Sequence, residues 1–146
     1  MKTKTILLMS ILLSTAVAQS DPEIIILSEV QRLVGFIDQF QQISQDVNDT
    51  DFKIAAGVAH SVARSVNITM NAYHLIHIQA MITGTEDKQA VSSYVMKQLP
   101  GLSRLMKIES RLTEEMIEQC RNEKVLNKSK EYLHSLLTIT STLDSI

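Results

Sequence analysis

The sequence contains a single cysteine, two prolines, four glycines and no tryptophan among its 146 residues. One cysteine cannot form an internal disulfide, so the domain has to be stabilised by the burial of apolar side chains. Few glycines, few prolines and an aromatic content of 4 % disfavour a β-sandwich, and seven methionines suit a helical bundle. A chain of this length has room for one ordinary domain.

The sequence also lacks a surplus of positive charge and any long apolar run after its first twenty residues. Its formal net charge is −2, and removing Lys2 and Lys4 from the 14 basic residues leaves 12 against 16 acidic ones. A nucleic-acid-binding domain typically carries a clustered basic surface, so we expect no nucleic-acid partner. We likewise expect no membrane insertion once the N-terminal segment has been removed.

The first 18 residues predict a secretory signal peptide. Lys2 and Lys4 provide a basic start, residues 6–13 an almost wholly apolar segment, and Ala16, Val17 and Ala18 a small-residue cleavage site. We expect cleavage after Ala18 and an exported product, periplasmic or extracellular. Residues 19–146 then form a single all-α domain.

Apolar residues at helical spacing predict four helices, over 21–47, from Asp51 to about Thr83, from Thr85 to near Asn127, and from there to the C-terminus. The second and longest carries one continuous apolar face, made of Phe52, Ala55, Ala59, Val62, Val66, Met70, Tyr73, Ile76 and Ala80. The third has a broad apolar side, made of Val91, Val95, Leu99, Leu102, Leu105, Met106, Leu112, Met116 and Cys120.

Short connections between these segments favour antiparallel neighbours, and the predicted fold class is an all-α antiparallel four-helix bundle. Pro100 and Gly101 interrupt the third helix, where we expect a kink rather than a break. The turn near Asn127 has no glycine or proline to mark it, and a single helix running through is the alternative.

The ends of the longest helix are also predicted from the sequence. Either Asp49 or Thr50 is expected to cap its start. Gly84 is expected to close it in the left-handed conformation, and Thr85 to cap the next helix.

The sequence holds no catalytic signature: no glycine-rich phosphate loop, no paired-cysteine motif and no His-Glu-x-x-His. We therefore predict a protein that is not an enzyme and has no cofactor. Cys120 continues the apolar stripe of Leu112 and Met116, which predicts a buried, unreactive thiol.

A metal- or haem-binding bundle is the alternative function. His74 and His77 stand three residues apart, with Met70 and Met81 nearby, and imidazole with thioether sulfur suits copper or an axially ligated haem. Two histidines without a visible third or fourth ligand make an incomplete shell, so we expect no tight binding.

Three Asn-x-Ser/Thr sequons, at Asn48, Asn67 and Asn127, leave open a glycosylated secreted helical factor as a third function. Two of the three lie in predicted turns and Asn67 on a polar helix face. The short basic start and the Ala-x-Ala site favour a bacterial source and the periplasm instead.

A second apolar line on the longest helix points to a binding surface. Ile68, Leu75 and Ile82 recur every seven residues, with Ile78 beside them. They flank a polar stripe on the side away from the apolar face, made of His60, Arg64, Asn67, Asn71 and His74. Either the third helix covers this line, or a protein partner or second copy does. The preferred hypothesis is a binding or assembly module that acts through helix faces.

Overall fold

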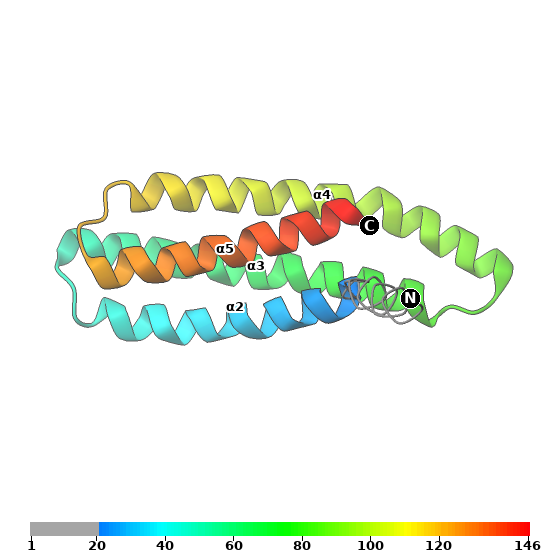
Figure 1. Ribbon diagram of the computed structural model, residues 1–146, viewed down its shortest axis with the longest axis horizontal. Helices are drawn as coiled ribbons and strands as arrows, with labels where there is room; N and C mark the ends of the chain where they lie inside the picture. Colours follow the sequence, from blue (N-terminus) through cyan, green and yellow to red (C-terminus); the bar gives the residue numbers. More distant parts are fainter. Residues whose placement is uncertain (1–20) are drawn as a thin grey trace, which may run out of the picture.

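The computed structural model describes residues 21–146, which form four antiparallel helices (Figure 1). Helix α2 spans Pro22–Ser44, α3 Asp49–Met81, α4 Thr85–Ile117 and α5 Glu123–Ser145. Each helix packs against the next, α2 closes the bundle against α5, and α3 also contacts α5 across the middle. The predicted four-helix bundle is confirmed, whereas the predicted signal peptide lies outside the described residues.

None of the four described helices is apolar enough over a sufficient length to span a membrane. The helices instead bury one face each in a common core. The largest fully buried side chains come from all four helices and include Ile26, Leu33, Phe40, Val58, Val62, Val95, Met106, Tyr132, Leu136 and Ile139.

Side-chain caps set the start of three helices. The Asp21 carboxylate accepts a hydrogen bond from the Glu23 amide at 3.0 Å, directly before Pro22. The Asn48 side chain accepts one from the Asp51 amide at 3.0 Å, so Asn48 caps α3. The expectation that Asp49 or Thr50 would cap α3 is therefore wrong, because both residues are already helical.

The junction between α3 and α4 also differs from the expectation. Gly84 has a φ of −71° and is not left-handed, because it serves as the N-cap of α4. Thr85 is the first residue of α4 rather than its cap. An extended Ile82 ends α3, so the helix needs no left-handed glycine there.

The turn predicted near Asn127 is wrong, and so is the alternative of one uninterrupted helix. Helix α4 ends at Ile117, and Asn122 caps α5 by accepting hydrogen bonds from the amides of Lys124 and Val125 at 2.9 and 3.2 Å. An asparagine cap followed by Glu123 in the first turn is a favourable helix start, since the acid lies at the positive end of the helix dipole.

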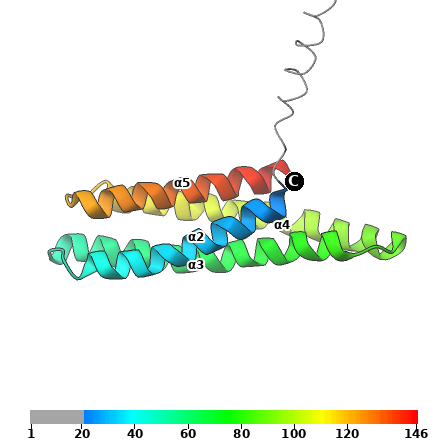
Figure 2. The same ribbon diagram turned by 60° about the horizontal axis from the view of Figure 1, so that its bottom comes forward.

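Helix α4 continues through Pro100 and bends near it, as predicted (Figure 1). Proline has no N–H to donate to the Met96 carbonyl, and its ring crowds that turn of the helix. Just after the bend α4 meets the end of α5, where the Ser103 hydroxyl donates to Asp144. Before the bend, α4 runs alongside the C-terminal part of α3, and together they extend beyond α2 and α5 as a two-helix arm (Figures 1 and 2).

The buried face of α3 is rotated from the predicted apolar stripe. Phe52 is 48 % exposed, whereas Ser61, Ser65 and Thr69 are fully buried. Apolar periodicity identified Ala55 and Val62, which are buried, but missed these three residues because they are polar. These hydroxyl groups introduce a polar cluster into the bundle.

Candidate functional site

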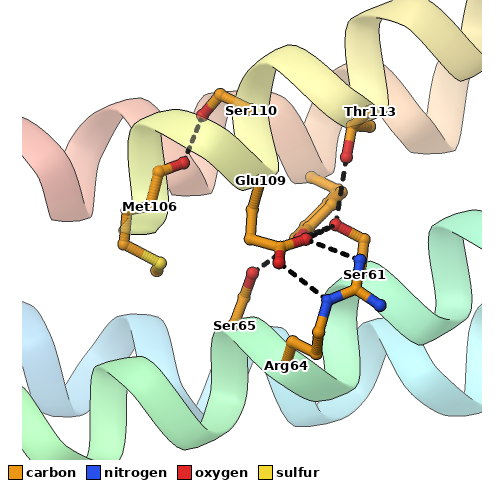
Figure 3. Close-up of polar contacts among 8 residues, drawn as sticks. Ser61, Arg64, Ser65, Met106, Glu109, Ser110 and Thr113 are labelled. Carbon is orange, nitrogen blue, oxygen red and sulfur yellow. Dashed lines mark hydrogen bonds and ion pairs between the residues drawn. The ribbon is translucent and has the colours of Figure 1, made fainter. Parts of the chain in front are cut away.

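The polar cluster joins α3, α4 and α5 around one carboxylate (Figure 3). Arg64 of α3 forms two hydrogen bonds with Glu109 of α4, Nε to Oε1 at 2.7 Å and a terminal nitrogen to Oε2 at 2.9 Å. The Glu109 side chain is only 8 % exposed, and that of Arg64 is 51 % exposed. Arg64 therefore covers a buried charge from the solvent side.

Hydroxyl groups complete the cluster on the inner side of Glu109. Ser61 donates to Glu109 Oε2 at 2.6 Å and lies 3.0 Å from the Tyr132 hydroxyl. Ser65 lies 2.7 Å from the same tyrosine oxygen, and Thr113 lies 3.2 Å from Ser61. Since the Ser61 proton goes to the carboxylate, a consistent arrangement has Ser65 donating to Tyr132, and Tyr132 and Thr113 donating to Ser61.

This geometry ties α3, α4 and α5 together through hydrogen bonds. Burial raises the pKa of Tyr132 to about 12, so its hydroxyl remains neutral. The hydrogen bonds to Glu109 raise the pKa of Arg64 above its already high value. Glu109 accepts from Arg64 and Ser61 together, which fixes the register of α3 against α4.

Beside this cluster, α3 and α4 form an open groove of about 770 Å³ on the outside of the bundle. Its lining comes from both helices: Lys53, Ile54, Gly57, His60 and Arg64 of α3, and Leu112, Glu115, Met116 and Gln119 of α4. A Cβ atom placed on Gly57 would lie 2.7 Å from the Met116 sulfur. Glycine at this position therefore lets Met116 pack directly over α3.

An apolar stripe on α4 continues from the groove toward the middle of the helix. Leu105, Ile108 and Leu112 are spaced by three and four residues, so they share one face of α4. They are 46, 39 and 36 % exposed. We call this stripe together with the groove the α3–α4 surface.

The four predicted interaction residues lie in two environments along α3. Ile68 and Leu75 are partly buried against the core, and Leu75 lines a small recess with Tyr94 and Leu102 of α4. Ile78 is exposed in the arm, and Ile82 is partly buried at the end of α3. Helix α4 thus lies beside Leu75, whereas Ile78 remains exposed.

The residues of the alternative metal site lie along α3, where Met70 is partly buried and His77 is engaged by other side chains. His77 Nδ1 lies 2.6 Å from Glu23 Oε1 of α2, and its ring stacks on Tyr73 with centroids 5.5 Å apart. His74 and Met81 are exposed. Among residues 21–146, no three His, Cys, Asp or Glu side chains are grouped as a metal would require.

Of the three sequons, Asn127 differs in context from the expectation. Asn48 lies in a turn but uses its side chain to cap α3. Asn127 lies within α5 rather than in a turn, and Asn67 is exposed on α3.

Cys120 lies in the loop between α4 and α5 rather than on the apolar stripe of the helix. It is half-buried, and its sulfur lies 3.5 Å from both an Asp51 carboxylate oxygen and the Asn122 carbonyl. The Arg121 amide donates to the same Asp51 oxygen at 3.0 Å and lowers the pKa of that carboxyl group. Asp51 therefore connects the start of α3 with the α4–α5 loop.

We predict that Cys120 reacts slowly with a disulfide reagent at neutral pH in the folded protein. Burial raises the pKa of the thiol, which lowers the fraction present as the reactive thiolate. The rate of thiol labelling should increase markedly in denaturant at the same pH. Equal rates in the folded and unfolded protein would contradict this environment.

Comparison of the chain with protein-family models, with curated proteins and with solved structures finds no match in any of the three. The function therefore has to be argued from the four-helix bundle and from the surface and cluster described above.

Proposed function

We propose that this protein is a non-enzymatic binding module that holds a partner helix on the α3–α4 surface. The observation that carries the proposal is the exposed stripe of Leu105, Ile108 and Leu112. Contiguous exposed apolar residues with a polar rim are typical of interaction sites, and a stripe at helical spacing suits an apolar helix face. The adjoining groove widens this apolar area with Ile54 and Met116.

The surrounding structure supports a rigid surface for such a partner. The Arg64–Glu109 pair fixes α3 against α4 directly beneath the groove. Met116 over Gly57 brings the two helices close at the next turns. A preformed surface loses little conformational entropy when a partner binds, which favours affinity.

Replacing Ile108 with Glu tests the proposal. Because the side chain is exposed, the variant should keep the helicity and melting temperature of the wild type while losing its partner. Val34→Glu is the matched control, since Val34 is an exposed apolar residue (48 %) on α2. The measurement is capture from the exported protein fraction of the source cells by each immobilised protein, followed by sedimentation of the captured complex.

The wild type and Val34→Glu should retain the same discrete protein, and Ile108→Glu should not. Equal retention by all three proteins, or no protein retained specifically by the wild type, contradicts the proposal. Unfolding of Ile108→Glu would show that this part of α4 is buried, which also contradicts it.

A further inference from the structure

One edge of the groove on the α3–α4 surface is lined by basic side chains, although the chain as a whole carries a net negative charge. Lys53, His60 and Arg64 follow one another along α3 at spacings of seven and four residues, so their side chains lie along one edge of the groove. The full chain has 16 acidic and 14 basic residues. This basic edge therefore contrasts with the net negative charge of the chain.

The acidic side chain that lines the groove has a basic partner on its own helix. Glu115 lines the groove from α4, but its carboxylate lies 3.7 Å from Arg111 of the same helix. Within the described part of the chain, neither Lys53 nor His60 forms an ion pair. Arg64 uses two of its five N–H groups on Glu109 and leaves the others available at a half-exposed position.

The shape and length of the surface favour an elongated apolar ligand. Apolar side chains from both helices line the groove beside the basic edge, namely Ile54 of α3 and Leu112 and Met116 of α4. From Leu105 to Gln119 the surface follows α4 for about 21 Å, or roughly four helical turns. A surface of this length matches a helix of four or five turns better than a compact small molecule.

We infer that the occupant of the α3–α4 surface is an amphipathic helix that carries acidic residues beside its apolar stripe. The apolar stripe would pack on Leu105, Ile108, Leu112 and Met116, and its carboxylates would face Lys53, His60 and Arg64. The inference rests on the proposed function and specifies the chemistry of the partner. Charge complementarity at the rim of such a complex contributes to specificity and to the association rate.

The test uses two synthetic amphipathic helices of about five turns with the same leucine stripe. One carries glutamate at the flanking positions and the other lysine. Binding to the full protein is measured by fluorescence anisotropy at low and at physiological salt. The glutamate helix should bind, and added salt should lower its affinity. The lysine helix should bind at least about tenfold more weakly.

Charge variants of the protein localise the effect. Lys53→Glu should lower the affinity for the glutamate helix about tenfold, because it replaces electrostatic attraction with repulsion. Lys130→Glu is the matched control on the exposed face of α5 and should leave binding unchanged. Neither position belongs to the Arg64–Glu109 cluster, so both variants should fold normally.

Three outcomes overturn the inference. Equal binding of the two helices, or no effect of Lys53→Glu, contradicts the inference of an acidic partner. The proposed function still stands in that case if Ile108→Glu abolishes binding. If Ile108→Glu leaves the affinity for the glutamate helix unchanged, the helix binds elsewhere, and the proposed function is overturned as well. Sedimentation of the protein alone as a dimer that Ile108→Glu dissociates would make a second copy the occupant.

Discussion

Replacing Arg64 with Met is expected to lower the free energy of unfolding by about 3 kcal/mol. The substitution keeps most of the aliphatic side chain but removes both guanidinium hydrogen bonds from Glu109. A carboxylate that is 8 % exposed would then depend on Ser61 as its donor. An uncompensated buried charge is costly, and the partial exposure of Arg64 places the effect at the lower end of the usual range of about 3–5 kcal/mol.

The double variant Arg64→Met/Glu109→Leu is the control for this prediction. It removes both charges together, so most of the lost stability should return. Urea unfolding followed by circular dichroism measures all three proteins. If Arg64→Met costs less than about 0.5 kcal/mol, or if the double variant is no more stable than Arg64→Met, the pair does not stabilise the helices as described.

The second large effect is a loss of stability in alkali that depends on Tyr132. Burial raises the pKa of this phenol from 10.0 to about 12 in the folded protein. Between these two values the unfolded chain releases a proton that the folded protein retains, so ionisation favours unfolding. The contribution is fully present below pH 10 and is lost as the pH rises to about 12, by about 2–3 kcal/mol.

Tyr132→Phe isolates this contribution. The variant has no phenol to ionise at position 132, so its free energy of unfolding should fall less than that of the wild type between pH 10 and pH 12. At neutral pH the variant should be about 1–2 kcal/mol less stable, because Ser65 loses its side-chain partner in the core. Parallel alkaline profiles for the two proteins would show that Tyr132 ionises as an exposed residue does.

The helices and their antiparallel order could be predicted from the sequence because they depend on local patterns. Apolar spacing within each segment identified four helices, and Pro100 marked the bend in α4. The boundary between α4 and α5 was missed because polar residues occur on both sides of Asn122, and the sequence gives no glycine or proline to choose between them.

The polar cluster could not be predicted because its members are far apart in the chain. Ser61 and Tyr132 are 71 residues apart, and Arg64 and Glu109 are 45 apart. Tyr132 follows the apolar spacing of α5, but each of the other members alone resembles an ordinary surface position of a helix. One available signal was the line of small hydroxyl residues formed by Ser61, Ser65 and Thr69, which runs along one side of α3 at spacings of four.

The α3–α4 surface was recognised only in part from the sequence. Leu105 and Leu112 were assigned to the broad apolar side of the third helix, which was expected to face the core. That side is wider than the contacts of α4 with α3 and α5 can cover, and both residues therefore remain exposed. The predicted line lies on the neighbouring helix α3, where Ile68 and Leu75 are partly buried against the core.

The most direct test of the binding surface is an NMR titration of the isotope-labelled protein with the glutamate helix. The backbone amide signals of Lys53, Ile108 and Leu112 should shift progressively and saturate together. Signals of exposed apolar positions on other helices, such as Val34 and Leu137, should remain in place. Shifts concentrated around Val34 or Leu137, with Ile108 and Leu112 unaffected, would contradict the assignment of the α3–α4 surface.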